Sequence, residues 1–368
     1  MMIHKRNTES KSFIKPGCNV ASRFIQKMLK NVPMKRIFIV AIILWCSLLP
    51  RMSVAQVDPH FSQYYAYPLW LNPALTGVID GDYRISGDYR NQWANYGKPF
   101  STAGVSIDAA TNKNVGVGLN VMNMSAGDAG YNYFNAMASV SYSGVKFGPT
   151  KTSQLVFGIN AGLINRRLDP AKFQTGSQYQ PVTGFDPSIF NGENVNNTTS
   201  NQFDAGAGVV YFDGNANHMF NPFAGFAAAH LTQPKDPFSA DGTERKLPVR
   251  YLLHGGTKIK LNEAVSLTPT GLYMRQGNAE EIVAGVYAQL MVNPEFDFLV
   301  GGNYRFNDAV IPFAGFHFKS FTLGLSYDAN TSNMRRLVNG SQSFEVSLSF
   351  ISRKRRVLNE EYFICPRL

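Results

Sequence analysis

The sequence predicts an all-β protein: a transmembrane antiparallel β-barrel of about 14 strands, with an N-terminal aromatic segment that plugs or caps its periplasmic side. The first observation is alternation, which gives each strand one apolar and one polar face, as a wall between lipid and water requires. The last such stretch shows it most clearly, because its two faces are Phe344, Val346, Leu348 and Phe350 against Ser343, Glu345, Ser347 and Ser349.

The second observation is the composition. Charged residues make up 16% of the chain and aromatic residues 13%, whereas soluble domains carry roughly 25% charged residues. A soluble β-sandwich also alternates, so the leader and the placement of the aromatic residues are needed to favour a membrane barrel. In many of the stretches the aromatic residues stand near one end, as interfacial girdles require.

The third observation is the leader. Met34, Lys35 and Arg36 precede an apolar run over 37–49, and the small residues of 53–55 follow. This pattern predicts a secretory signal peptide over 34–55, and its apolar run is too short to span a bilayer as a helix. Residues 1–33 are predicted to be a spurious or unstructured N-terminal extension, with translation beginning at Met34. Residues 56–368 are then a single barrel domain, with the barrel over 81–351 and a C-terminal tail over 352–368.

Removal of the leader changes the charge and cysteine balance. Residues 1–55 hold ten basic residues and one acidic residue, so the net charge falls from +10 to +1. The basicity therefore gives no reason to expect nucleic-acid binding. Cys18 and Cys46 lie in the leader, which leaves Cys365 alone and excludes an intramolecular disulfide.

The first seven predicted strands cover 82–93, 100–110, 114–124, 131–143, 152–165, 201–212 and 220–231. In the first, the aromatic and aliphatic residues Tyr83, Ile85 and Tyr89 interleave with polar residues. In the third, valine and leucine alternate with glycine and asparagine from Val115 to Val121. In the sixth, the outward face runs from Phe203 to Tyr211.

The last seven predicted strands cover 248–260, 264–275, 280–292, 295–306, 309–318, 320–329 and 341–351. If both termini are periplasmic, alternate connections should be tight, and those at 112–113, 261–263, 293–294 and 319–320 obey this. The longest connections, 166–200 and 232–247, fall on the opposite, outer side, where 166–200 covers or rims the mouth. The connections at 276–279 and 307–308 are outer yet short, so the predicted rim is uneven.

The predicted inner face carries glycines and charges, each with two interpretations. The glycines either relieve crowding and permit curvature or leave room for a partner segment threaded through the lumen. The charges either pair across the lumen and stiffen the wall, or act as hydrogen-bonding rungs for a secreted peptide. These charged residues are Arg84, Asp88, Arg90, Asp204, Arg305, Asp328 and Glu345.

The two ends of the mature chain are distinctive as well. Segment 57–80 holds an aromatic cluster interrupted by Pro68 and Pro73, and aromatic residues there require burial. The segment is either an internal plug or a docking surface for a periplasmic partner. Arg353–Arg356 either faces solvent and lipid phosphate or contacts an acidic partner, and the tail over 362–366 packs on the barrel.

An ordered set of short motifs runs along the mature chain. It comprises Phe61-Ser62-Gln63-Tyr64, Asn72-Pro73-Ala74 with Gly77, Tyr89-Arg90-Asn91-Gln92-Trp93, Lys98-Pro99-Phe100, Gly116-Val117-Gly118, Phe203-Asp204-Ala205-Gly206-Ala207-Gly208, His230-Leu231-Thr232-Gln233-Pro234, Tyr304-Arg305, Asp308-Ala309, Ser326-Tyr327-Asp328, Ser343-Phe344-Glu345 and Cys365-Pro366. No single motif is specific, but the ordered set resembles the PorP/SprF proteins of the Bacteroidota type IX secretion system.

The resemblance implies an outer-membrane barrel that serves protein secretion, surface anchoring and, in some members, gliding motility. It implies as partners a secreted surface protein with a type B sorting domain, the periplasmic ring lipoprotein, an OmpA-like peptidoglycan-binding component and outer-membrane lipid. The residues expected to bind a partner or line the lumen are Phe61, Gln63, Tyr64, Trp70, Asn72, Arg84, Asp88, Arg90, Trp93, Asp204, Arg305, Asp328 and Glu345.

Two other function classes compete with secretion. A passive outer-membrane channel for small or hydrophobic molecules is the alternative, because other 14-strand barrels serve that purpose. Enzymatic activity is not expected: the histidines are scattered, and no nucleophile motif or metal-ligand spacing joins them. His230 and Asp204 could meet across neighbouring strands, as a paired barrel histidine. No cofactor or metal is predicted.

Overall fold

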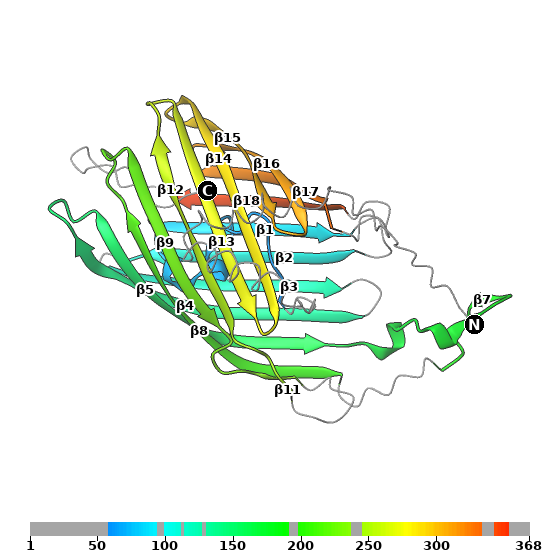
Figure 1. The fold of residues 1–368 in the computed structure, drawn as a ribbon. Helices are drawn as coiled ribbons and strands as arrows, with labels where there is room; N and C mark the ends of the chain where they lie inside the picture. The colour runs from blue at the N-terminus through cyan, green and yellow to red at the C-terminus, as the bar shows by residue number, and fades with distance from the viewer. Residues whose placement is uncertain are drawn as a thin grey trace, which may run out of the picture. The chain divides into compact units, whose positions relative to one another are not determined.

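The computed structural model describes residues 58–93, 99–111, 114–126, 130–190, 198–236, 245–332 and 342–352. Fourteen antiparallel strands close into a barrel in the order β1-β18-β17-β16-β15-β14-β13-β12-β9-β8-β5-β4-β3-β2 (Figure 1). The predicted fold class is therefore confirmed. The strands are β1 (Tyr83–Gln92), β2 (Phe100–Ala110), β3 (Val115–Ala126), β4 (Tyr131–Phe147), β5 (Ser153–Arg167), β8 (Thr199–Asp213), β9 (Phe220–Ala229), β12 (Arg250–Lys260), β13 (Val265–Gln276), β14 (Ala279–Asn293), β15 (Phe296–Arg305), β16 (Ala309–Phe318), β17 (Phe321–Asn330) and β18 (Gln342–Ser352).

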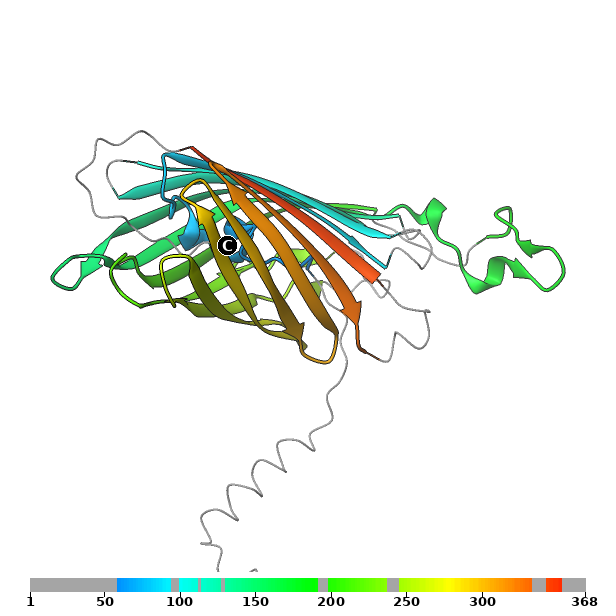
Figure 2. The ribbon, with the colours of Figure 1, turned by 90° about the horizontal axis from the view of Figure 1, so that it is seen from above.

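The first and last strands close the barrel. β18 lies beside β1 (Figure 2) and pairs with it along its length, from Tyr83 opposite Ser352 to Gln92 opposite Ser343. Closure matters because an unpaired strand edge in hydrocarbon would leave amide groups without partners, at several kcal/mol each. No helix in the described part of the chain has the length and apolar character needed to cross a bilayer.

The predicted strands agree with the observed ones to within a few residues. The largest difference is at β4, which runs to Phe147 because β5 continues to pair with it as far as Ser153. The connection between β5 and β8 also contains short elements that the sequence did not indicate: η3 (Pro170–Lys172), η4 (Gly176–Gln178), β6 (Tyr179–Gln180) and β7 (Gly184–Phe185). In the next long connection, β10 (Lys235–Asp236) pairs with β11 (Arg245–Lys246).

The two ends of the barrel differ in their connections. One end, here the short-connection end, holds 111–114, 148–152, 214–219, 261–264, 294–295 and 319–320, with the start of β1 and the end of β18. The other, the long-connection end, holds 168–198 and 230–249, together with the short links 277–278 and 306–308. The uneven rim expected from the sequence is thus present at the long-connection end.

The outer face of the wall carries an apolar band between aromatic groups. Exposed aliphatic residues such as Leu119, Ile159 and Leu348 lie along the middle of the strands. Near the short-connection end the rings of Phe321 and Phe350 lie 4.9 Å apart. Near the long-connection end exposed aromatic pairs recur, among them Tyr304 and Phe306, 5.0 Å apart. This arrangement is typical of a barrel whose wall faces lipid.

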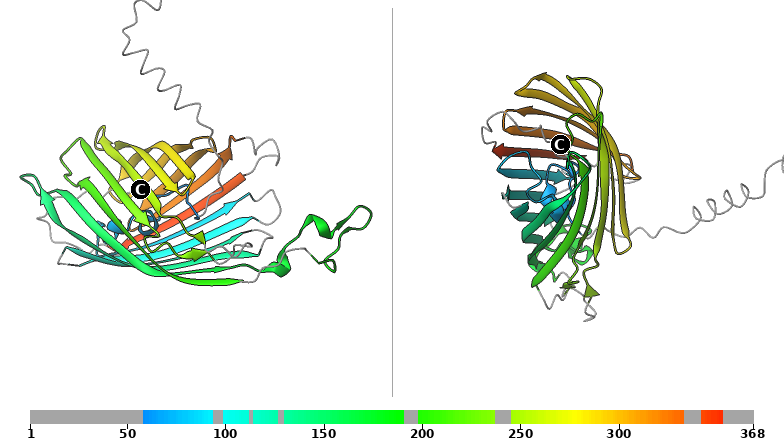
Figure 3. Two further views of the ribbon diagram at one scale, coloured as in Figure 1. Left: turned by 60° about the horizontal axis from the view of Figure 1, so that its bottom comes forward. Right: turned by 90° about the vertical axis from the view of Figure 1, so that its left-hand side faces the viewer.

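Residues 58–80, here the lumen segment, lie inside the ring of strands (Figure 3). They form α3 (Pro68–Leu71) and η1 (Pro73–Leu75), and Tyr67 and Ala74 are fully buried. Each short helix begins with proline, whose fixed φ suits the first helical position. The Asn72 side chain accepts a hydrogen bond from the Ala74 amide, which caps η1.

Candidate functional site: the lumen segment and its anchors

The lumen segment runs from one end of the barrel to the other. Asp58 contacts His230 and Arg250, which lie at the end of β9 and the start of β12, at the long-connection end. Gly77 contacts Asp108, near the short-connection end of β2. The segment was expected to plug or cap the periplasmic side of the barrel, and in the structure it extends from one mouth to the other.

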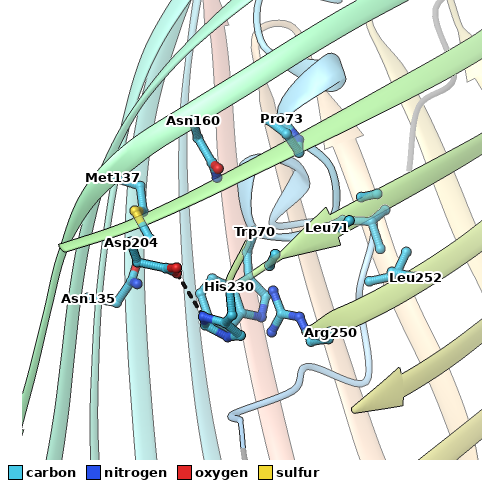
Figure 4. A pocket seen from close by; sticks show the side chains of 13 residues that line it. Trp70, Leu71, Pro73, Asn135, Met137, Asn160, Asp204, His230, Arg250 and Leu252 are labelled. Carbon is cyan, nitrogen blue, oxygen red and sulfur yellow. Dashed lines mark hydrogen bonds and ion pairs between the residues drawn. The ribbon is translucent and has the colours of Figure 1, made fainter. Parts of the chain in front are cut away.

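The first anchor, the Asp58 cluster, consists of Asp58 together with Asp204, His230 and Arg250, and Figure 4 shows the last three. His230 Nε2 lies 2.5 Å from Asp58 Oδ2, and His230 Nδ1 lies 2.7 Å from Asp204 Oδ2. Arg250 lies 3.1 Å from Asp58 and stacks 4.1 Å from the centre of the Trp70 ring. Two carboxylates thus face two cations, and all four groups are buried.

The electrostatics of the Asp58 cluster favour its charged state. Burial alone would raise the pKa of Asp58, but the charges of His230 and Arg250 outweigh burial and lower this pKa to about 2. Burial alone would lower the pKa of His230, but the Asp58 charge and hydrogen bonds to both carboxylates raise it to about 9. His230 is therefore an imidazolium that donates to two carboxylates at neutral pH.

The second anchor, the Glu345 cluster, consists of Arg90, Glu281, Arg305, Asp328 and Glu345. Its contacts with the segment begin at Glu345, which accepts hydrogen bonds from the Ser62 amide at 2.7 Å and the Gln63 amide at 2.6 Å. The Ser62 hydroxyl donates to Asp328 at 2.7 Å. Gln63 also reaches the Ser347 hydroxyl at 2.7 Å. The wall thereby recognises the peptide backbone as well as side chains.

The guanidinium groups of this cluster hold its carboxylates together. Arg90 lies 2.7 Å from Asp328, and Arg305 lies 3.1 Å from Asp328 and 3.3 Å from Glu281. Arg90 also donates to the His60 carbonyl at 2.8 Å. Burial, and then the positive charges of Arg90 and Arg305, hold the pKa of the His60 imidazole well below its usual value. His60 is therefore neutral.

The third anchor holds the end of the segment. Asp108 accepts the Gly77 amide at 2.7 Å and two hydrogen bonds from Arg84, at 2.9 and 2.8 Å. Arg84 also donates to the Leu75 carbonyl at 3.1 Å. Such a bidentate ion pair fixes geometry as well as charge. The segment is therefore held at both mouths.

Between the anchors, neutral polar groups hold the middle of the segment. The Tyr67 hydroxyl lies within hydrogen-bonding distance of Asn120 and of two wall carbonyls, Val105 at 3.1 Å and Val121 at 2.9 Å. Asn72 donates to the Val209 and Phe226 carbonyls, both at 3.2 Å. Burial raises the pKa of the Tyr67 hydroxyl, which remains protonated.

Several inward glycines leave room for this segment. A Cβ atom at Gly104 would lie 2.7 Å from the Tyr67 ring, and one at Gly158 would overlap the backbone of Pro73 and Ala74. Cβ atoms at Gly116 and Gly208 would meet Thr76 and Asn72. At these positions the glycines make room for the chain's own segment, whereas the sequence had suggested either relief of curvature or room for a partner segment.

The structure brings most of the expected site residues together. All seven inward charges face the lumen, and six of them pair with other residues there. Asp88 differs, because neither of its carboxylate oxygens has a hydrogen-bond partner within the described residues. Trp93 lies apart from the anchors, with its ring 4.8 Å from Phe100. The expected residues that contact the anchors or the segment are Phe61, Gln63, Tyr64, Trp70, Asn72, Arg84, Arg90, Asp204, Arg305, Asp328 and Glu345.

Other anchor residues were missed by sequence reasoning. Asp108 stands at an inward position of a predicted strand, so the alternation could have indicated it. Asp58 and Arg250 carry no such signal. Asp58 is separated along the chain by 172 residues from His230 and by 192 residues from Arg250, so no local pattern records these contacts. His230 and Asp204 do meet, as the sequence allowed. The leader, Arg353–Arg356 and Cys365 lie outside the described residues.

The described residues contain no group of three or more His, Cys, Asp or Glu side chains that could hold a metal ion. What the arrangement does chemically is hold the segment inside the lumen. Buried charges that lose a partner are costly, by about 3–5 kcal/mol per pair. Each anchor therefore resists removal of the segment.

Comparisons with solved structures find distant likenesses. The chain is similar to the CymD monoaromatic hydrocarbon channel, at 11% identity and a TM-score of 0.46, over 82% of this chain and 96% of that one. It is also similar to the Ralstonia pickettii toluene transporter TbuX, at 10% identity and a TM-score of 0.43, over 77% and 93% of the two chains. No curated protein sequence matches the chain.

The family comparison is more specific. The model described as the type IX secretion system membrane protein PorP/SprF matches residues 53–350, which is well over half of the chain. The match covers the lumen segment and all but the last two residues of the barrel wall. This protein therefore belongs to the PorP/SprF family of type IX secretion system membrane proteins.

Proposed function

We propose that this protein is an outer-membrane component of the type IX secretion system that pairs with a secreted surface protein and anchors it or aids its export. An adhesin with a type B sorting domain is the expected partner. The observation that carries the proposal is the filled lumen: the chain's own segment crosses the barrel and is held at both mouths. A barrel closed in this way is suited to holding a partner rather than to conducting solutes.

The proposed orientation places the short-connection end in the periplasm and the long-connection end outside. The leader supports export, and short periplasmic turns with longer outer loops are usual in bacterial outer-membrane barrels. In this orientation the short-connection end faces the periplasmic ring lipoprotein and the OmpA-like peptidoglycan-binding component. The long-connection end would present the surface protein, with gliding motility as one outcome.

A passive channel is the competing function. It would require the lumen segment to leave, and with it at least three sets of buried hydrogen bonds and ion pairs. No observation favours that movement. A passive channel would show stable conductance steps for the wild-type barrel, and single-channel recording distinguishes this function from the proposed one.

The test of the proposed function is isolation of the tagged protein from native membranes after mild cross-linking, with mass spectrometry of what co-purifies. A secreted protein with a type IX sorting domain should be enriched over a matched preparation of an unrelated tagged outer-membrane barrel. Recovery of the barrel alone, at cross-linker levels that capture known complexes in the same membranes, would refute the pairing.

A further inference from the structure

The lumen segment fills the barrel unevenly. On the side of β2 to β8 it touches the wall, where a Cβ at Gly104, Gly116, Gly158 or Gly208 would strike it. On the side of β14 to β18 the segment touches the wall at Ser62 and Gln63, and two cavities lie beside these contacts. The larger has an empty volume of about 1050 Å³, including solvent at its mouth, and the smaller has about 340 Å³.

The two cavities adjoin, because Gln63, Tyr65, Tyr287 and Phe313 line both of them; together they are called the passage here. The larger cavity is also lined by Asp80, His317 and Ile351, which lie at the short-connection end. The smaller one reaches Ser62, which is bound to the Glu345 cluster. The passage therefore extends from the short-connection end to the second anchor.

The walls of the passage suit an extended peptide. Hydroxyl side chains line it at intervals on adjacent strands, including Ser86, Thr322, Ser347 and Ser349. Apolar residues of the segment and wall, such as Val78 and Leu299, lie between them. Hydroxyl groups can donate to or accept from a peptide backbone, whereas the apolar surfaces can pack against its side chains.

One buried carboxylate in the passage lacks part of its hydrogen bonding. Asp297 accepts from Gln289 on Oδ2 at 3.0 Å, and His317 Nδ1 lies 3.2 Å from the same oxygen. Its Oδ1 has no partner in the described part of the structure, and the Asp297 side chain is 7% exposed. The lining also includes Asp80 and Arg84, and Arg84 is already paired with Asp108. A cationic donor would satisfy Asp297.

We propose that this passage is a docking site for an extended peptide segment of a partner protein, entering from the short-connection end with one lysine or arginine directed at Asp297. The site rests on the proposed function, for which it supplies the contact with a polypeptide arriving from the periplasm. The lumen segment forms one wall of the site and blocks its far end, so the peptide docks without passing through.

The test is binding of a synthetic peptide to the purified barrel in detergent. The probe is an eight-residue peptide of alternating serine and leucine with one central lysine, labelled at its C-terminus and followed by fluorescence anisotropy. Matched peptides carry norleucine or glutamate in place of lysine. The lysine peptide should bind at least tenfold more tightly than either of them.

Variants locate the binding. Asp297→Asn should weaken binding of the lysine peptide at least tenfold and leave the norleucine peptide unchanged. Ser349→Phe, which fills the passage without altering Asp297, should weaken both peptides. Asp186→Asn, a matched carboxylate change on the exposed connection at the opposite end, should have no effect. Unchanged heat-modifiability on gels shows that each variant is folded.

Three results would overturn the site: no binding to the wild-type barrel at millimolar peptide, equal binding by the lysine and norleucine peptides, or equally tight binding of free lysine amide, which indicates a small cationic ligand. A different result would refute the proposed function. Peptide binding with no co-isolated secretion partner would refute that function and keep the site. Partner isolation that is unchanged in Asp297→Asn and Ser349→Phe would refute the site and keep the function.

Discussion

At the scale of single residues, the Asp58 cluster makes the stability of the barrel depend on pH. The pKa of His230 is raised from 6.5 to about 9, so its contribution is fully present below pH 6.5 and is lost as the pH rises through 9. The pKa of Asp58 is lowered from 3.8 to about 2, so its contribution is present above pH 3.8 and is lost as the pH falls through 2. Both contributions are therefore fully present between pH 3.8 and pH 6.5, where the Asp58 cluster holds the segment most strongly.

This predicts that the wild-type barrel unfolds at a lower temperature at pH 9.5 than at pH 6. The free energy of unfolding should fall by an amount on the order of 3 kcal/mol, which is the joint contribution of His230 and Asp58. His230→Gln should be less stable at pH 6 and should lose that pH dependence. Thermal unfolding in detergent, followed by circular dichroism, measures both effects. His218→Gln, at a half-exposed histidine near the other end, is the control and should keep the wild-type dependence. A pH dependence that survives in His230→Gln would contradict the assignment.

Glu345 is the residue on which the second anchor depends most. Glu345→Gln replaces one of the two carboxyl oxygens that accept backbone amides and leaves Arg90 with one carboxyl partner fewer. We expect a loss of about 3–5 kcal/mol in the free energy of unfolding, from urea titration. Glu263→Gln, on an exposed connection, should change stability by less than about 0.5 kcal/mol. Equal effects of the two substitutions would argue against the anchor.

At the scale of elements, the close approach of the segment to β5 can be tested with one methyl group. Gly158→Ala places a Cβ against the backbone of Pro73 and Ala74, which cannot rotate away as a side chain can. We expect the free energy of unfolding to fall by about 1–3 kcal/mol and proteolysis within residues 58–80 to become faster. Gly87→Ala on β1 meets one atom at 3.8 Å and should be tolerated. A Gly158→Ala barrel as stable as Gly87→Ala would show that the segment does not rest on β5.

The elements also show what the sequence can predict. The strands could be predicted from alternation. The side chains of β18 and its neighbours face lipid and lumen in turn, so the sequence of each strand alternates between apolar and polar residues. The path of the lumen segment leaves no such pattern. It depends on single contacts across the lumen, such as Ser62 to Glu345, 283 residues apart. The prolines and aromatic residues indicated burial, but not the wall they would meet.

At the scale of the whole molecule, the proposed orientation makes a prediction about access. An epitope inserted at Ser188, on an exposed part of the long connection, should be labelled by antibody on intact cells. The same epitope inserted at Glu263, on a short connection, should be labelled only after the outer membrane is permeabilised. The opposite pattern of labelling would reverse the orientation and place the docking passage at the cell surface.

The central claim is that the chain's own segment occupies the lumen, and single-channel recording in planar bilayers tests it most directly. The wild-type barrel should show no stable conductance steps, whereas a variant that lacks residues 58–76 and still resists heat as a folded barrel should show them. Steady conductance of the wild-type protein, equal to that of the deletion variant, would contradict the claim.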